Sequence, residues 1–226
     1  SAAYRAPGSP QAAFATETVS DELARIHGMD PIDFRLQNAS KEGTRRADGV
    51  VFPKVGNVEV LEAAKKSDHW NSDLGTPAKG RVRGRGVASG YWFNVGLKST
   101  VNLSVNSDGS VVLVEGSSDI GGTRTSISMQ AAEILGIEVE NFRPSVGDTE
   151  TAGYADVTGG SRTTYATGFA AVKAAENLIE VLKDRCAIIW SLDKNDIDFE
   201  DGTFFASKDP ELKFTFKELA SNLDNT

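Results

Sequence analysis

Two nearly identical glycine-rich pentapeptides constrain this chain more than any other feature, because each opens an apolar-periodic segment. The first is GGTRT at residues 121–125, and the second is GGSRT at residues 159–163. Glycine inside a helix costs about 1 kcal/mol relative to alanine. Paired glycines at two helix starts therefore indicate that the backbone itself has a task at these positions.

Each pentapeptide has two interpretations. A helix start carries unpaired N–H groups and the positive end of the helix dipole, and successive glycines let such groups form a concave nest for an anion. The alternative is that each loop only caps its helix, since Ser and Thr are ordinary capping residues. The repetition favours an anion or cofactor cradle, although the spacing matches neither a Walker loop nor G-x-G-x-x-G. The candidate cradle residues are Gly121, Gly122, Thr123, Arg124, Thr125, Gly160, Ser161, Arg162 and Thr163.

Hydrophobic periodicity predicts an α+β fold, a mixed β-sheet with packed helices. Helices are expected at residues 11–26, 31–38, 58–66, 125–135, from the second pentapeptide to about 182, and 214–223. Strand signals run from 81 to 115 and from 142 to 146, and Asp201-Gly202 predicts a hairpin turn. The expected division is an N-terminal helical segment and linker at residues 1–78, followed by an α+β domain at residues 79–226.

Composition excludes several classes of function. The net charge of −8 disfavours a nucleic-acid surface. One cysteine cannot ligate an iron–sulfur cluster, and two isolated histidines give no zinc-ligand spacing. No apolar run has the length of a membrane span, and no secretory leader opens the chain. The abrupt start without Met suggests a piece of a larger protein or a processed product. The expected location is the cytoplasm.

Further motifs occur in a recognisable order. "AYRAPGSPQ" precedes "GMDPIDFRLQNA", and then follow "GSSDIGGTRTSISMQAAEILGI", "VGDTET" and "GGSRTTYATGFAAVKAAENL". This order resembles the molybdenum-binding subunit of the xanthine dehydrogenase/aldehyde oxidase family, and the resemblance spans roughly residues 3–182. It implies a domain of the molybdenum-cofactor-binding type.

The resemblance implies a molybdopterin cofactor, either alone or as a dinucleotide, held mostly by backbone amides of the two glycine loops. The pterin then ligates molybdenum, so no side chain of this chain is expected to bind the metal. The positions implied to lie near substrate or molybdenum are Arg5, Ala6, Pro7 and Phe93. Phe93, with Tyr91 and Trp92, would form an aromatic wall of the pocket or, alternatively, ordinary packing.

The chain also departs from the family pattern. Many relatives carry Gly-Gln-Gly where this chain has Gly121-Gly122-Thr123, so the hydrogen bond from that glutamine to an oxo group on molybdenum is missing or replaced. Ala6 stands where the family's carbon monoxide dehydrogenases carry a copper-binding cysteine, and Pro7 stands where purine-oxidising relatives often carry Phe. The family's catalytic base is a glutamate that follows a glycine, and none of the 22 glycines here is followed by Glu.

The expected function is therefore that of an inactive fragment of a molybdenum hydroxylase subunit. The parent would oxidise an aldehyde or hydroxylate an N-heteroaromatic carbon of a small-molecule substrate with oxygen from water. Its partners would be the rest of the subunit and separate 2Fe–2S and FAD units. The alternative is a non-catalytic binding or interaction domain that keeps the scaffold without the cofactor.

Three other features have alternative interpretations. The alternating basic residues of "KGRVRGRG" at 79–86 indicate a phosphate-binding stripe or, preferably, a solvated edge strand. Asp148, Glu150 and Asp156 form an acidic segment that is better interpreted as a surface turn than as a calcium loop. Cys186 is expected to be a buried small hydrophobic residue.

Overall fold

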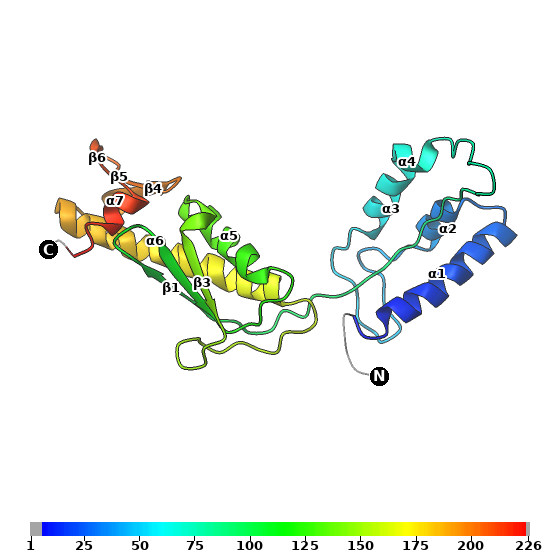
Figure 1. The fold of residues 1–226 in the computed structure, drawn as a ribbon, viewed down its shortest axis with the longest axis horizontal. Coiled ribbons are helices and arrows are strands. Elements are labelled where there is room, and N and C mark those ends of the chain that lie inside the picture. The colour runs from blue at the N-terminus through cyan, green and yellow to red at the C-terminus, as the bar shows by residue number, and fades with distance from the viewer. Residues whose placement is uncertain (1–5, 225–226) are drawn as a thin grey trace. The chain divides into compact units, whose positions relative to one another are not determined.

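The structure, a computed structural model, describes residues 6–224. It forms two units, which are joined in the sequence between Trp92 and Phe93 (Figure 1). The division predicted from the sequence, between residues 1–78 and an α+β domain at residues 79–226, stays a prediction.

The first unit consists of helices and loops. Its helices are α1 (Ser9–Ile26), α2 (Pro31–Asn38), α3 (Asn57–Lys66) and α4 (Asp68–Asn71). The three helices predicted in this region are confirmed to within two residues. Asp30 caps α2, because its carboxylate accepts from the amides of Ile32 and Asp33 at 2.8 and 3.1 Å. Pro31 in the first turn has no N–H to satisfy, which suits that position.

A buried arginine ties the first unit together. Arg35 on α2 lies 2.7 Å from the Glu17 carboxylate and 2.8 Å from that of Asp21, both on α1. Glu17 also accepts from the Ser89 amide at 2.7 Å, so it binds the segment after α4 as well. Burial acts to raise the pKa of Glu17, but the hydrogen bonds from Ser89 and Arg35 prevail and lower it.

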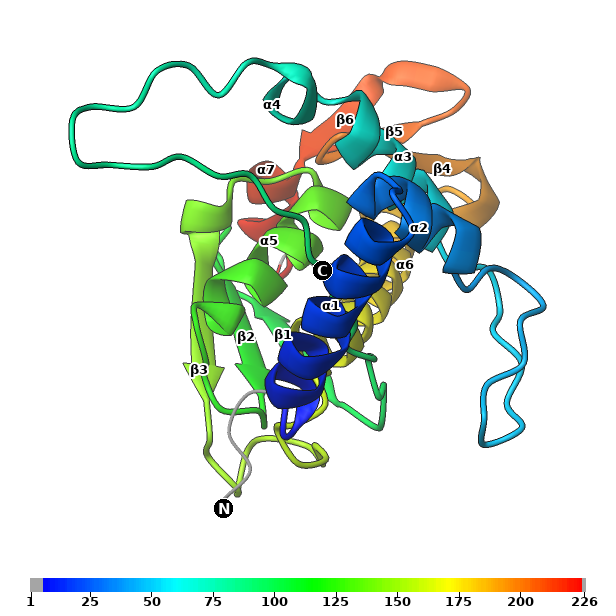
Figure 2. The ribbon, with the colours of Figure 1, turned by 90° about the vertical axis from the view of Figure 1, so that its right-hand side faces the viewer.

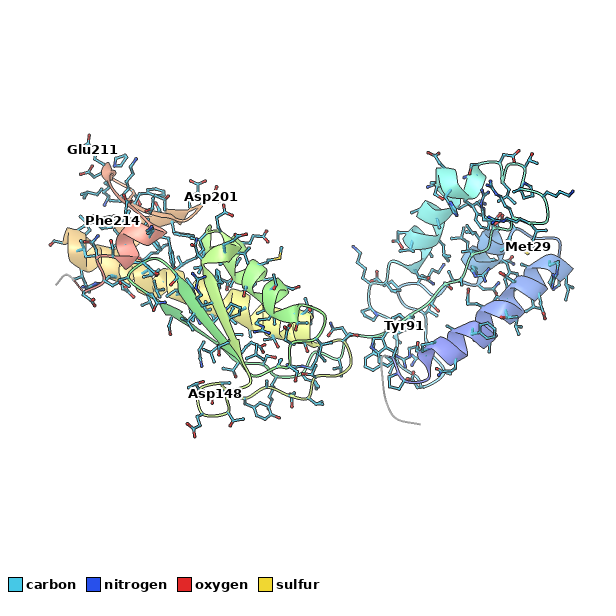
Figure 3. All side chains as sticks on the ribbon, viewed as in Figure 1. Met29, Tyr91, Asp148, Asp201, Glu211 and Phe214 are labelled. Atoms are coloured by element: carbon cyan, nitrogen blue, oxygen red, sulfur yellow. The ribbon has the colours of Figure 1, made fainter. Side chains whose placement is uncertain are left out.

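The strand predicted from residue 81 onward is wrong up to residue 100. Among the described residues, 72–100 contain no strand; Tyr91 lies on this extended segment (Figure 3). A period-2 pattern becomes a strand only if a second strand pairs with it. Here Arg83 donates to the Leu74 carbonyl at 2.8 Å, and Arg85 donates to the Ser72 hydroxyl at 3.1 Å. These two arginines therefore bind the preceding loop, and the edge-strand interpretation fails.

The second unit contains two small sheets. The first sheet joins β1 (Val101–Val105), β2 (Val111–Glu115) and β3 (Phe142–Val146), which lie side by side in Figure 2. β1 and β2 are antiparallel, whereas β2 and β3 are parallel. The helices α5 (Thr123–Leu135) and α6 (Gly168–Trp190) share one hydrophobic core with this sheet. The parallel pair requires the crossover through α5, and the predicted α+β class with a mixed sheet is confirmed.

Short helical turns connect the larger elements. The 3₁₀ turns η1 (Val139–Asn141) and η3 (Lys194–Asp196) precede strands, and η2 (Thr163–Thr167) is one turn of π-helix that continues into α6. The predicted end of α6 at residue 182 was too early, because its buried face continues through Cys186 and Ala187. Gly136 ends α5 in the left-handed conformation, as an αL cap requires.

The second sheet is an antiparallel meander of β4 (Ile197–Glu200), β5 (Thr203–Ala206) and β6 (Asp209–Thr215), followed by α7 (Phe216–Ala220). The predicted hairpin turn at Asp201-Gly202 is confirmed, and Figure 3 labels Asp201 there. The helix predicted from residue 214 begins later. Phe214 pairs with Phe204 across the sheet and its ring stacks 5.1 Å from that of Trp190, which keeps residue 214 in the strand.

Candidate cofactor cradle

The first glycine loop presents backbone amides to open space. Gly121 and Gly122 both have left-handed backbones, with φ of +62° and +82°, and α5 begins directly after them. A Cβ on either glycine would meet nothing within 4 Å, so the glycines serve backbone conformation and leave the surface open. Within residues 6–224, no acceptor pairs with the amides of Gly121, Gly122 and Thr123. Such a helix start is suited to bind an anion.

An internal carboxylate already lies at this helix start. Asp119 accepts from the Arg124 amide at 3.2 Å and from its guanidinium at 2.9 Å, and the Thr123 hydroxyl lies 3.4 Å away. The hydrogen bond from the Arg124 side chain is the main cause that lowers the pKa of Asp119. Arg124 is half-exposed and its charge is balanced, so an incoming anion would have to compete with Asp119.

The second glycine loop is packed instead of open. Gly160 has φ of +61°, and a Cβ there would lie 2.6 Å from a methyl carbon of Val95. The Gly160 carbonyl accepts from the Val95 amide at 3.0 Å, and the Ser161 carbonyl accepts from the Asn94 side chain at 2.9 Å. Ser161 is also left-handed, with φ of +55°, and it is exposed. Glycine is needed at 160 because the segment 93–96 passes directly over it.

The two equivalent arginines have opposite environments. Arg162 is fully buried and donates to the carbonyls of Gly96 at 2.9 Å, Asp156 at 2.8 Å and Lys98 at 2.7 Å. Its guanidinium therefore holds neighbouring backbone segments together and does not face solvent as a phosphate ligand. Thr163 is buried as well. The groups of this loop that could bind a ligand are its backbone and the Ser161 hydroxyl.

The two loops lie at the same end of the second unit (Figure 1). Gln130 on α5 donates to the Thr164 carbonyl in the π-helical turn at 3.2 Å. The Ser117 and Thr167 hydroxyls lie 3.1 Å apart and join the loop before α5 to the turn before α6. A surface pocket of about 440 Å³ opens beside the second loop. Its lining residues are Asn94, Gln130, Ser161, Thr164, Tyr165, Phe169 and Val172.

The positions implied to lie near substrate have separate placements. Arg5 lies outside the described residues. Ala6 and Pro7 belong to the first unit, where Ala6 has a left-handed backbone with φ of +48° and its carbonyl accepts from the Ser9 amide at 3.0 Å. Phe93 begins the second unit, is partly exposed, and its ring lies 3.8 Å from where a Gly160 Cβ would be. Phe93 is therefore adjacent to the second loop, and the roles of all four residues stay predictions.

The acidic segment is a surface turn. Asp148, labelled in Figure 3, accepts from the Glu150 amide at 3.0 Å and the Thr151 hydroxyl at 2.7 Å. Asp156 accepts from the Tyr154 hydroxyl at 2.6 Å and the Lys98 amide at 2.7 Å. In the part of the chain that the structure describes, no group of three or more His, Cys, Asp or Glu side chains is arranged to hold a metal ion.

Sequence reasoning missed the polar residues that lie beneath the two loops. Glu115, Ser117 and Thr167 are all buried, and the half-buried Ser99 contacts Thr167. Only Glu115 had a signal in the sequence: Val111, Leu113 and Glu115 alternate along β2, so the carboxylate shares the inward face with two apolar side chains.

Comparison with known proteins decides the family. Residues 56–225 match a profile described as molybdopterin cofactor-binding domain, and residues 1–39 match a second profile of the same description. The chain belongs to the molybdopterin cofactor-binding domain family.

Named relatives agree with this assignment. This family member is 32% identical, over 77% of its length, to the aldehyde oxidoreductase molybdenum-binding subunit PaoC of Escherichia coli O157:H7. It is also 32% identical, over 83% of its length, to the xanthine dehydrogenase molybdenum-binding subunit of the same organism. The chain covers 25% and 26% of these relatives, about a quarter of their length. The predicted resemblance to this family is confirmed.

A solved structure shows the same fold. Quinoline 2-oxidoreductase from Pseudomonas putida 86 superposes with a TM-score of 0.73 at 19% identity, over 93% of this chain and 29% of that one. At this identity the likeness concerns the fold alone. None of the described helices is long and apolar enough to cross a membrane.

Proposed function

We propose that the two glycine loops of this molybdopterin cofactor-binding domain form a cradle for molybdopterin. The observation that carries the proposal is the pair of consecutive left-handed glycines at the start of α5, whose amides have no acceptor within the described residues. These amides are suited to the anionic oxygens of a phosphate. The exposed Ser161 hydroxyl and the partly exposed Phe93 ring add a donor and an apolar surface at the second loop.

The proposed roles of the predicted cradle residues differ between the loops. Gly121, Gly122 and Thr123 would contribute amides, whereas Arg162 would shape the second loop from beneath through its three carbonyl contacts. Arg124 would become available to an anion only if that anion displaces Asp119. The bound group would supply two-electron redox chemistry at molybdenum, and this chain would supply position and hydrogen bonds.

We further propose that the chain acts as part of a longer molybdenum hydroxylase subunit, as the quarter-length coverage of its relatives suggests. That subunit would oxidise an aldehyde or hydroxylate an N-heteroaromatic carbon, and two electrons would pass to 2Fe–2S and FAD partners in the cytoplasm. The family's base glutamate would come from residues outside this chain, so this chain alone should be inactive.

One specific observation favours the alternative of a scaffold without cofactor. The Asp119 carboxylate already accepts from the Arg124 amide at this helix start and pairs with the Arg124 guanidinium. In that case Asp119 would supply the negative charge at the helix start in place of a ligand, and the domain would serve only binding or interaction.

The test is the molybdenum and pterin content of the native protein complex, measured by metal analysis and by the fluorescence of the oxidised pterin. Gly122→Asp should reduce both contents about tenfold or more, because the new carboxylate lies beside the free amides and repels an anion. Gly147→Asp is the matched control, since Gly147 has φ of +81° and nothing within 4 Å of its Cβ position.

Gly147→Asp should leave both contents unchanged. If the wild-type complex contains neither molybdenum nor pterin, the proposal is overturned in favour of the scaffold without cofactor. Equal contents in wild type and Gly122→Asp would exclude the first loop from the cradle.

A further inference from the structure

A buried glutamate lies beneath the first glycine loop. Glu115 is 0% exposed at the end of β2, and its Oε2 accepts from the Ser117 amide at 2.5 Å. Its other oxygen, Oε1, is buried without a hydrogen-bond partner in the described part of the chain. A buried carboxyl costs free energy unless it is paired, so its presence in a core position requires an explanation.

A chain of hydroxyl groups runs from Ser117, whose amide binds this glutamate, to the second loop. Ser117 Oγ lies 3.1 Å from Thr167 Oγ1, which lies 2.8 Å from Ser99 Oγ. Ser99 Oγ in turn accepts from the Arg162 guanidinium. Because an arginine can only donate, the Ser99 hydroxyl is the acceptor in that contact, whereas in the Ser99–Thr167 and Thr167–Ser117 contacts either hydroxyl can be the donor.

The chain of contacts connects three segments of the proposed cradle. Ser117 belongs to the loop that leads to the first glycine pair, and Thr167 ends the π-helical turn after the second pair. Ser99 belongs to the segment whose carbonyls at Gly96 and Lys98 are held by Arg162. Thr167 is the central link, since its buried hydroxyl contacts both Ser99 and Ser117.

We propose that Thr167 is a positioning residue which couples the two glycine loops, so that they open and close as one unit. Its role for cofactor rests on the proposed function, but the coupling itself is a property of this chain alone. The charged groups that act on Glu115 are Asp119 on its own loop and Arg162 on the second loop. The row of contacts therefore has Arg162 at one end and the segment of Glu115 at the other. The hydroxyls between them couple the position of one loop to that of the other.

The coupling can be tested by hydrogen exchange, residue by residue, on the full chain without added cofactor. The amide of Ser117 reports on the first loop, and the amides of Val95 and Asp156 report on the segments around the second loop. Thr167→Val keeps the shape and removes the hydroxyl. This substitution should raise the exchange rate about tenfold or more at all three amides, because it removes the hydrogen bonds that hold both loops closed.

Thr167→Ser restores the hydroxyl and should return exchange to within about twofold of wild type. Thr164→Val is the matched control in the same turn, because the Thr164 side chain is exposed, and it should change none of the three amides. An increase at Val95 and Asp156 without one at Ser117, or no increase at all, would overturn the coupling.

A second variant covers the case in which Thr167→Val fails to fold. Ser117→Ala alters only the first loop, yet the coupling requires faster exchange at Val95 and Asp156 as well, about threefold or more. An effect confined to the first loop would contradict the proposal. In the native complex, Thr167→Val should lower pterin content and Thr167→Ser should preserve it.

If wild-type complex contains no pterin, the proposed function fails. The exchange measurements still decide the coupling in that case, so the two proposals fail separately.

Discussion

The backbones of Gly136 and Gly202 lie in direct contact. A Cβ on Gly136 would lie 2.2 Å from the Gly202 amide nitrogen, and a Cβ on Gly202 would lie 2.4 Å from the Gly136 carbonyl oxygen. Both residues are left-handed, with φ of +58° and +72°. The end of α5 therefore packs on the β4–β5 turn at a distance that only two glycines allow.

We expect Gly136→Ala and Gly202→Ala each to lower the free energy of unfolding by roughly 3 kcal/mol, from left-handed strain and steric overlap together. Denaturant unfolding measures the change. Gly159→Ala is the control, because a Cβ there meets nothing within 4 Å and its φ is not positive. It should stay within about 0.5 kcal/mol of wild type. Equal stability of all three variants would show that the contact is not tight.

The two arginines of the repeated pentapeptide should respond differently to the same substitution. Arg162→Lys should cost about 2 kcal/mol or more, because one ammonium cannot replace a fork that serves the carbonyls of Gly96, Lys98 and Asp156. Arg124→Lys should cost less than about 1 kcal/mol, because its ion pair with Asp119 is half-exposed. The measurement is again denaturant unfolding, and a larger loss from Arg124→Lys would refute the structural role of Arg162.

Stability should depend on the titration of Glu115. Burial raises the pKa of Glu115 above its usual 4.5, against the lowering effect of the Ser117 hydrogen bonds. A raised folded pKa means that the contribution of the group is fully present below about 4.5 and is lost as pH rises through the folded value. Glu115→Gln should therefore gain stability relative to wild type as pH increases above 4.5.

Denaturant unfolding at pH 4 and pH 7 checks this expectation. The quantity compared is the difference in the free energy of unfolding between Glu115→Gln and wild type at each pH. A difference that is the same at both pH values would show that Glu115 titrates normally in the folded protein.

Cys186 should be inert in the folded protein. Burial raises the pKa of its thiol to about 12, and its side chain is 0% exposed on α6. Alkylation at pH 8 should be at least about a hundredfold slower in buffer than in denaturant, since only the accessible thiolate reacts. Mass spectrometry measures the single modification, because the chain has one cysteine. Rapid labelling in buffer would mean that α6 opens locally.

Local signals predicted most of the elements. The Asp30-Pro31 start of α2, the Gly136 end of α5 and the Asp201-Gly202 turn were found because each depends on a few neighbouring residues. The segment after residue 81 was predicted wrongly, because alternation does not reveal whether a partner strand exists. The start of α7 was misplaced, because Phe214 is held in β6 by contacts with Phe204 and Trp190.

The amino-acid sequence by itself determined the α+β class, the family and the positions of the two glycine loops, since these depend on periodicity and ordered motifs. Only the tertiary structure decided what the two arginines do. Nearly identical neighbours surround Arg124 and Arg162 in the sequence, yet one pairs with Asp119 at the surface and the other is buried among backbone carbonyls. The reason is physical: burial depends on which distant segment packs over a loop, and here residues 93–99 cover the second loop.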